Sequence, residues 1–294
     1  MSNNAEILKI ESVFEILKKR EHESNKGDYG LLTAICGSAF YRGAAALAVN
    51  AALRSGVGIA RLASIEKVVS SVASKINGCI YLPVRENKSG TISAESLPVI
   101  LAATEKSTAV LVGCGMMNCD DTRKIVVALV EQCKCPMVLD ADALNSLADD
   151  PGILRKSATC PIITPHVGEM SRLCGKSIYE IKEYPEKTAL EFSKNNNCIT
   201  ILKDSTTFVA SPDGKLSVNT EKNAGLAKGG SGDVLAGMVA SLLAQGYPAY
   251  DAARCAVKLH SAASLRCAER MSEYGMQPDD IVFDLCKIFA EYGY

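Results

Sequence analysis

The sequence predicts an α/β fold with a largely parallel central sheet and one domain. Short apolar or β-branched runs alternate with longer segments of helical periodicity, a pattern typical of βαβ units. Of the 294 residues, 48% are hydrophobic and 22% are charged, which is enough apolar material to bury a sizeable core. We find no Ser-, Gly- or Pro-rich linker, low-complexity tract or internal repeat in the sequence, so we expect residues 1–294 to form a single domain.

Seven apolar runs are predicted as strands of one doubly wound sheet: 31–36, 59–63, 79–83, 109–112, 137–140, 161–164 and 199–203. Helices are predicted between and after them, at 44–54, 122–132, 177–194, 234–244 and 250–271, and Gly56 and Gly246 end two of these helices. Residues 206–210 and 215–218 flank the turn at Pro212-Asp213-Gly214, which predicts a hairpin at an edge of the sheet. Beyond the hairpin the chain is predicted to be almost wholly helical.

The balance of charges argues against binding to nucleic acid or to a membrane surface. Lys and Arg number 32 and Asp and Glu number 33, so the net charge of −1 provides no overall field for either partner. No window reaches the roughly 18 apolar residues of a membrane span, and residues 1–6 lack the basic and apolar regions of a signal peptide. We therefore expect a cytoplasmic protein.

Twelve cysteines are present, mostly within apolar runs, and we interpret them as buried, reduced thiols. The closest pairs are Cys133 with Cys135 and Cys114 with Cys119. Neither pair has the two-residue spacing of zinc ligands or a second Cys or His pair nearby, so the spacing does not favour a zinc site.

The most informative segment is a glycine cluster that leads directly into an amphipathic helix. In the run Gly229-Gly230-Ser231-Gly232, glycines allow successive N–H groups to converge, and the helix start adds unpaired donors and a positive dipole end. This predicts an anion hole for phosphate. Asp233 follows at once and has two interpretations, a helix cap or a general base. A carboxylate here repels phosphate, so its presence favours a base that takes a proton from an attacking hydroxyl.

Other loops follow predicted strand ends, where ligands bind in open α/β sheets. The loop 37–43 allows either close approach of a ligand or tight helix packing, and Gly113 and Gly115 follow another strand. Asp140 and Asp142 are either helix caps or groups that position Mg²⁺ through water. His166 is either a surface residue or a ligand-binding one. Neither a P-loop nor the glycine spacing of a dinucleotide-binding motif is present in the sequence.

Three motifs taken together resemble those of the ADP-dependent NAD(P)H-hydrate dehydratase family. They are the segments 26–30 (KGDYG), 164–170 (TPHVGEM) and 227–237 (AKGGSGDVLAG), which occur in the family's order. With 140–145 (DADALN) and 244–246 (AQG), the resemblance extends from about residue 26 to the C-terminus, which leaves residues 1–25 as an N-terminal extension.

The resemblance implies a ribokinase-like three-layer αβα sandwich that carries a Gly-x-Gly-Asp anion hole and a catalytic aspartate, Asp233. It implies that the hydrated dinucleotide is contacted by Ala44, Gly115, His166 and Asp233. It also implies that the adenosine nucleotide, ADP or ATP, is contacted by Lys203, Asp204, Ser205, Thr206, Thr207 and Gly232, with Mg²⁺ as the cation. The chain departs from the family's usual Lys-Gly-Ala-Gly-Thr at 203–207 and from its Pro-Gly-Leu-Gly at 114–117.

The implied reaction is the dehydration of (S)-NAD(P)H hydrate to NAD(P)H with release of AMP and phosphate. The family's epimerase domain does not precede the match here, so we expect a separate NAD(P)H-hydrate epimerase as the functional partner, and the family implies a homotetramer. Two alternatives stay open: a vitamin-pathway kinase of the same fold, and a nucleotide-binding sensor without turnover. The sequence does not distinguish ADP from ATP or the two hydrates from each other.

Overall fold

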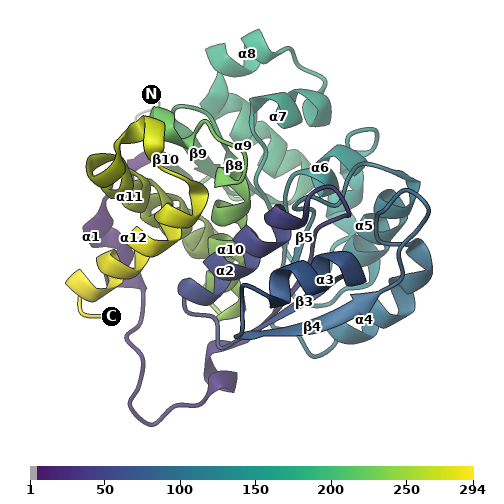
Figure 1. Cartoon of the computed structure of the whole chain (residues 1–294). Helices are drawn as coiled ribbons and strands as arrows, with labels where there is room; N and C mark the ends of the chain where they lie inside the picture. The colour runs from purple at the N-terminus through teal and green to yellow at the C-terminus, as the bar shows by residue number, and fades with distance from the viewer. Residues whose placement is uncertain (1–4) are drawn as a thin grey trace.

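The computed structural model describes residues 5–294, and these form three layers with a ten-stranded sheet between helices (Figure 1). The strand order is β1-β10-β9-β8-β7-β6-β5-β2-β3-β4. All neighbouring pairs from β8 to β4 are parallel, whereas β9 runs antiparallel to both β8 and β10. The predicted α/β class and the largely parallel sheet are therefore confirmed.

The strands are β1 (Glu6–Ile7), β2 (Leu31–Ile35), β3 (Ile59–Ile65), β4 (Cys79–Val84), β5 (Ala109–Val112), β6 (Met137–Leu139), β7 (Ile162–Ile163), β8 (Ile199–Leu202), β9 (Thr207–Ala210) and β10 (Leu216–Asn219). The predicted runs agree with them to within two residues at each end. The hairpin β9–β10 forms, but its predicted place at the edge is wrong, because β1 pairs in parallel with β10 beyond it. A strand of two residues shows no alternation in the sequence, so the first residues were predicted as an extension outside the fold. Residues 1–4 of that extension lie outside the described part.

The helices are α1 (Ile10–Ile16), α2 (Arg42–Arg54), α3 (Glu66–Ala73), α4 (Leu97–Thr104), α5 (Asp120–Gln132), α6 (Asp142–Ser146), α7 (Val167–Cys174), α8 (Ile178–Glu183), α9 (Pro185–Asn196), α10 (Ser231–Ala244), α11 (Ala249–Gly275) and α12 (Pro278–Glu291). The helix predicted at 177–194 is in fact two, because Pro185 lacks the N–H that a continuous helix needs and starts α9 instead. Helices α1, α3, α4, α6 and α7 were not predicted, since five to eight residues give too few turns for a clear period.

The helices cover both faces of the sheet. On one face lie α2, α3, α10 and α11, with α12 packed outside them, and on the other lie α4, α5 and α9 (Figure 1). Helices α2 and α10 meet closely, because a Cβ at Gly237 would lie 2.2 Å from the carbonyl oxygen of Ala48. Within residues 5–294, none of the helices is both long and apolar enough to cross a membrane.

The parallel arrangement determines where side chains can gather. The carboxyl ends of the parallel strands β2 to β8 all lie along the same border of the sheet, the carboxyl edge. The loops that follow these strands lie there together with the start of α10. This edge contains the segments 37–43, 113–119, 140–142, 164–166 and 203–206, all of which the sequence had singled out except the last few residues of the second. The candidate site is therefore built on ends of strands with fully buried side chains.

Candidate active site

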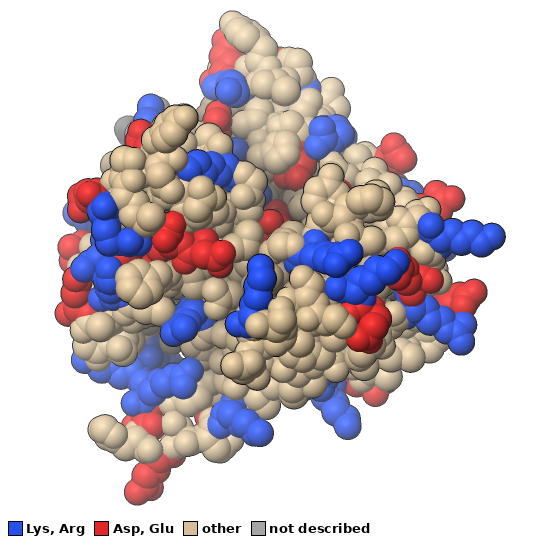
Figure 2. All heavy atoms as spheres, viewed as in Figure 1, with Lys and Arg blue, Asp and Glu red and all other residues tan. Residues whose placement is uncertain are grey.

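The face of the molecule at this edge is hollowed between the α7–α8 end and α2, and acidic atoms are visible inside the hollow (Figure 2). Elsewhere on the face shown, basic and acidic side chains are interspersed (Figure 2). This distribution agrees with the expectation that anions are bound locally and not by an extended basic surface.

The predicted anion hole forms the first turn of α10. Gly230 is the N-cap residue, with φ 103°, and a Cβ there would lie 2.5 Å from Cδ1 of Leu47. A Cβ at Gly229 would meet open space, whereas one at Gly232 would lie 3.3 Å from Nζ of Lys203. The position that needs a left-handed backbone is thus Gly230 and not Gly232. Because Gly232 has no side chain, the space between its backbone and the Lys203 ammonium stays open.

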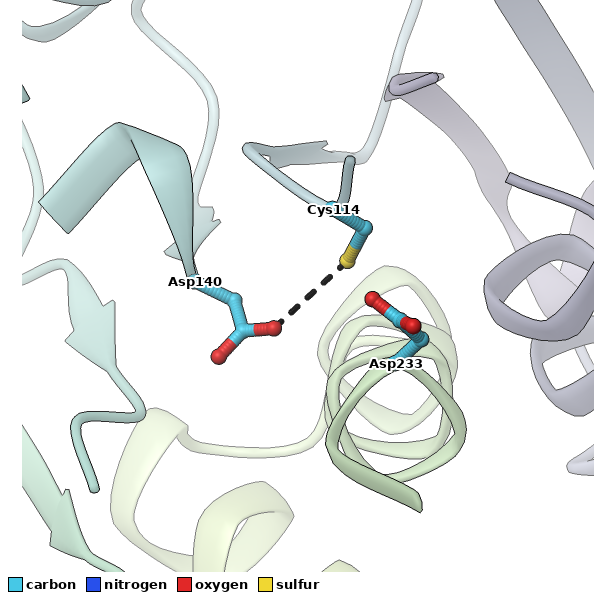
Figure 3. Close-up of side chains that lie close together, drawn as sticks. All are labelled: Cys114, Asp140 and Asp233. Atoms are coloured by element: carbon cyan, nitrogen blue, oxygen red, sulfur yellow. Dashed lines mark hydrogen bonds between the residues drawn. The ribbon is translucent and has the colours of Figure 1, made fainter. Parts of the chain in front are cut away.

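Asp233 is the third residue of α10, and its side chain points toward Asp140 and Cys114 (Figure 3). One ligand atom from each of these three residues lies within 4.8 Å of the other two. Because Gly230 occupies the N-cap position, the structure gives no support to Asp233 as the helix cap. The pKa of Asp233 is raised from its usual 3.8 to about 7. Burial and the nearby Asp140 charge raise it, and a hydrogen bond with Cys114 and the Lys203 charge offset part of the rise. A carboxylate with this pKa is suited to take a proton near neutral pH.

Asp140 lies at the end of β6 and is only 2% exposed. Its Oδ1 atom accepts hydrogen bonds from the Thr164 hydroxyl at 2.5 Å and from the Lys203 ammonium at 3.1 Å. Its Oδ2 atom lies 3.7 Å from Sγ of Cys114 (Figure 3). The buried carboxylate therefore joins the loops after β5, β6, β7 and β8.

Lys203 connects the anion hole with the loop after β7. Its backbone N–H donates to the carbonyl of Pro165 at 2.9 Å, and its side chain reaches both Asp140 and the space beside Gly232. Although burial opposes its charge, the neighbouring Asp140 and Glu169 keep the pKa of Lys203 above its usual value. Lys203 thus places a permanent positive charge beside the predicted phosphate position.

His166 has a structural role that the sequence did not predict. It is the N-cap residue of α7, where its Nδ1 atom accepts from the backbone N–H of Gly168 at 2.9 Å and of Glu169 at 3.3 Å. The Glu169 carboxylate accepts from the backbone N–H of His166 at 2.9 Å, which completes a capping box. Burial, with Lys203 and Arg172 nearby, lowers the pKa of His166, and its Nε2 atom lies 3.5 Å from Oε1 of Glu169.

Two other predicted substrate contacts, Ala44 and Gly115, lie side by side. A Cβ at Gly115 would lie 2.8 Å from Cβ of Ala44 and 2.8 Å from Cβ of Tyr41. In the same loop, Gly37 packs tightly, since a Cβ there would lie 2.8 Å from Val68, whereas one at Gly43 would meet open space. Close packing therefore explains the start of the segment 37–43, and room for a ligand remains at its end.

Asp142 is not a helix cap either. It is the first residue of α6, and its Oδ2 atom accepts from the backbone N–H of Met117 at 2.8 Å, which ties the loop after β5 to the loop after β6. Met117 has a φ of 66°, at the position where the family has glycine. The Asp142 bond supports a backbone conformation that a methionine seldom adopts.

The segment predicted to contact the nucleotide borders a separate pocket of about 180 Å³. Asp204, Ser205 and Thr206 line it beside apolar side chains, among them Ile181 and Phe208. Lys203 faces the anion hole and Thr207 begins β9, so the five predicted residues do not all face one cavity. Apolar walls with a few polar groups at one side are typical of a nucleobase or ribose site.

Sequence reasoning missed the surroundings of Asp140 and Asp233. Thr164 and Glu169 were noted only as parts of a motif, and Cys114 was weighed only against its neighbour Cys119. All twelve cysteines are free, but the prediction of buried thiols holds for only seven, because five are partly exposed: Cys119, Cys135, Cys160, Cys174 and Cys286. The structure places Cys114 beside Asp140 and Asp233. No spacing along the chain reveals this group, because its members come from the ends of two strands and the start of a distant helix.

Comparisons with known proteins agree with the geometry. A family model described as NAD(P)H-hydrate dehydratase matches residues 32–287. The chain is 34% identical over 257 residues to the ADP-dependent (S)-NAD(P)H-hydrate dehydratase of Xanthomonas campestris, with 87% of each chain covered. It is 33% identical over 270 residues to the bifunctional NAD(P)H-hydrate repair enzyme of Thermofilum pendens, with 92% of this chain and 52% of that protein covered.

Among solved structures, the ADP/ATP-dependent NAD(P)H-hydrate dehydratase of Bacillus subtilis, co-crystallized with ATP and Mg²⁺, superposes with a TM-score of 0.85 at 26% identity. The superposition covers 99% of this chain and 100% of that one. The chain spans about half the length of the bifunctional relatives it matches and most of the length of the single-activity ones.

Proposed function

Because this chain belongs to the NAD(P)H-hydrate dehydratase family, we propose that it converts the (S)-hydrate of NADH or NADPH back to NAD(P)H, using ADP and releasing AMP and phosphate. The observation that carries the proposal is Asp233, a buried carboxylate with a pKa of about 7 that follows a glycine loop at a helix N-terminus. The two features supply a base and a phosphate cradle next to each other.

The chemistry requires both features. The hydrate carries a hydroxyl at C6 of the reduced nicotinamide ring, and hydroxide is a poor leaving group. Asp233 takes the proton of this hydroxyl, and the oxygen attacks the β-phosphate of ADP, so that AMP leaves and a phosphate ester forms. The N–H groups of the segment 229–232 and the Lys203 ammonium stabilise charge on the transferring phosphoryl group.

The second half of the reaction restores the dihydropyridine ring. The lone pair of the ring nitrogen expels inorganic phosphate from C6, and loss of a proton from C5 forms the double bond. In this proposal Ala44, Gly115 and His166 bind the dinucleotide, and the adjacency of Ala44 and Gly115 supports that assignment for two of the three. The Nδ1 atom of His166 accepts two backbone N–H bonds, so the Nε2 side of the ring is the one offered to the dinucleotide.

ADP, or ATP, is placed with its phosphates at Gly232 and its adenosine along the segment 203–207. The pocket beside Asp204, Ser205 and Thr206 supports this placement. The Bacillus subtilis relative, an ADP/ATP-dependent enzyme, supports the use of either nucleotide. Asp204 stands where the family usually has glycine, and its carboxylate lies 3.7 Å from the Lys182 ammonium. This ion pair offsets the negative charge that Asp204 adds near the nucleotide.

The residues present also fit Mg²⁺, which prefers oxygen ligands. Asp140 and Asp142 provide carboxylates at adjacent strand and helix ends, and they would hold the ion through water next to the glycine loop. When bound, Mg²⁺ neutralises charge on the phosphate groups.

We further propose a cytoplasmic single-domain enzyme that assembles as a homotetramer. We also propose that it acts with a separate epimerase, since the bifunctional relatives are named for the repair of the hydrate as a whole.

The test is a complete mass balance. The purified protein is incubated with hydrated NADH, ADP and Mg²⁺, and the absorbance of reduced nicotinamide, AMP and inorganic phosphate are measured together. One phosphate and one AMP are expected for each NADH recovered. A stable phosphorylated product without recovered absorbance would assign the protein to the kinases, and nucleotide binding without any product would assign it to the sensors.

A further inference from the structure

The thiol of Cys114 lies inside the proposed active site and has no part in the proposed reaction. Cys114 follows β5 with no exposed surface, and its Sγ atom lies 3.7 Å from Oδ2 of Asp140. Asp233 approaches the same point from the start of α10 (Figure 3). The three ligand atoms lie within 4.8 Å of one another, and each comes from a different element.

Hydrogen bonds within this group cannot satisfy all three members at once. The Cys114 thiol interacts with both Asp140 and Asp233, but it has a single proton to donate. Lys203 and Thr164 are both bonded to Oδ1 of Asp140, which leaves Oδ2 facing the thiol. The neighbouring Cys36 thiol also interacts with Cys114. The single Cys114 proton therefore serves one acceptor at a time, and a cation that binds both carboxylates would end this competition.

The surrounding charges point the same way. The Lys203 ammonium contacts Asp140 through its Oδ1 atom at 3.1 Å, whereas the Oδ2 atom faces Cys114. A divalent ion would compensate the carboxylates from the side that Lys203 does not reach.

The donor set selects the class of metal. One thiolate and two carboxylates suit zinc and other thiophilic divalent cations, whereas Mg²⁺ avoids sulfur. Tetrahedral zinc, with bonds of about 2.3 Å to sulfur and about 2.0 Å to oxygen, holds its ligand atoms roughly 3.3–3.5 Å apart. Modest side-chain rotations close the present spacing to that geometry, and a water molecule completes the fourth position.

We propose that Cys114, Asp140 and Asp233 form a binding site for Zn²⁺ or a similar thiophilic cation, and that its occupation inhibits the enzyme. Binding displaces the thiol proton to solvent, so that a Cys114 thiolate and two carboxylates coordinate the metal. The metal then occupies the Asp233 carboxylate, which can no longer take a proton from the substrate.

Metal binding is measured first, without turnover, and so does not depend on the proposed function. Chelator-treated full-length protein is titrated with Co²⁺, which gives an ultraviolet thiolate-to-cobalt charge-transfer band, and with Zn²⁺ by calorimetry in buffers of different ionisation enthalpy. The expected result is one tight site that releases the thiol proton and, near neutral pH, the fraction of a proton that Asp233 still holds. Cys114→Ser should weaken Zn²⁺ binding by about 100-fold. Circular dichroism checks folding, and Cys114→Ala replaces the serine variant if that variant does not fold.

The matched control removes the other close thiol pair. Cys133 and Cys135 have Sγ atoms 3.3 Å apart and lie at the opposite ends of β5 and β6, so the double variant Cys133→Ser/Cys135→Ser should keep the cobalt band. A band that survives Cys114→Ser and disappears in the double variant would overturn the proposal, as would the lack of a thiolate band in the wild-type protein.

Inhibition is measured second and rests on the proposed function. Zn²⁺ should suppress NADH recovery, a chelator should restore it, and Cys114→Ser should raise the half-inhibiting Zn²⁺ concentration by about 100-fold, whatever the variant's own rate. Zinc bound at Cys114 without any effect on turnover would overturn the inhibitory part. A cobalt band that depends on Cys114 in a protein without dehydratase activity would refute the proposed function and leave the metal site standing.

Discussion

Two aspartates, the fully buried Asp284 and the partly buried Asp233, have opposite surroundings. Asp284 on α12 has no exposed surface and lies 3.0 Å from the Arg270 guanidinium and 3.0 Å from the Lys287 ammonium. Burial raises its pKa, but the hydrogen bonds from these two cations outweigh that effect and lower it below the usual value. Asp233 on α10 faces Asp140 instead, and its pKa rises to about 7.

The comparison separates two uses of a buried carboxylate. Asp284 is stabilised as an anion, so it joins α11 to α12 and has little tendency to take up a proton. Asp233 is destabilised as an anion, which costs folding free energy but gives a base whose pKa matches neutral pH. In the candidate active site, the burial that makes Asp233 a useful base also lowers the stability of the fold. The following variants test this difference between Asp233 and Asp284.

The largest expected effect is the loss of activity in Asp233→Asn. The amide keeps the shape of the side chain but cannot take a proton, so turnover of hydrated NADH should fall by roughly 100-fold or more. NADH recovery in the presence of ADP and Mg²⁺ measures it. Asp284→Asn is the control, because Asp284 lies outside the site and its loss should leave turnover within a few-fold of wild type. Activity that survives Asp233→Asn would remove Asp233 from the mechanism.

The next effect concerns the phosphate cradle. In Gly232→Val the new Cβ lies 3.3 Å from Lys203 Nζ, and its methyl groups fill the space beside the ammonium and the N–H donors. Losing a charge-assisted hydrogen bond of this kind should weaken ADP binding by about 10- to 100-fold. Calorimetry measures ADP and the dinucleotide separately, and the dinucleotide should bind as before.

Gly78→Val is the matched control for this substitution. A Cβ at Gly78 has only one neighbour, at 3.9 Å, and the residue precedes β4 at the opposite edge of the sheet. Its ADP affinity should therefore equal that of wild type. If Gly232→Val also binds ADP normally, the phosphate lies elsewhere.

Asp233→Asn should also increase stability, in contrast to its effect on turnover. The native protein binds the Asp233 proton more tightly than the unfolded chain does, so the free energy of unfolding of the wild type falls as pH rises from about 4 to about 7. The variant lacks this contribution, and its advantage should grow over that range, to at most about 4 kcal/mol, and stay constant above it. Urea unfolding of both proteins at several pH values measures the difference. An advantage that does not change with pH would mean that Asp233 is not destabilised as an anion.

The sequence predicted the frame of the site better than its electrostatics. Residues 229–233 were found because the glycine run, the helix start and the aspartate are adjacent in the chain. The loops after β5 to β8 were found because small and polar residues follow the ends of these strands. The sequence also left Asp233 open to interpretation as a cap, and it gave no sign that the pKa of this residue is raised. Both points depend on Asp140 and Cys114, whose approach to Asp233 is set by packing of α10 against the sheet and by no local pattern. The short β1 and the break before Pro185 were missed in the same way, because each depends on one or two residues.

The smallest expected effect is the stability loss in Asp284→Asn, and it completes the comparison. The substitution leaves Arg270 and Lys287 without their buried partner, but both cations are more than one-third exposed and water solvates them in part. The free energy of unfolding should therefore fall by only about 1–2 kcal/mol at pH 7, and the loss should shrink in strong acid, where the wild-type carboxylate is itself protonated. Urea unfolding at pH 7 and at low pH measures both quantities. Since Asp233→Asn is predicted to move stability in the opposite direction at pH 7, finding the same sign for the two variants at that pH would show that burial alone, and not the neighbouring charges, determines how this fold tolerates a carboxylate.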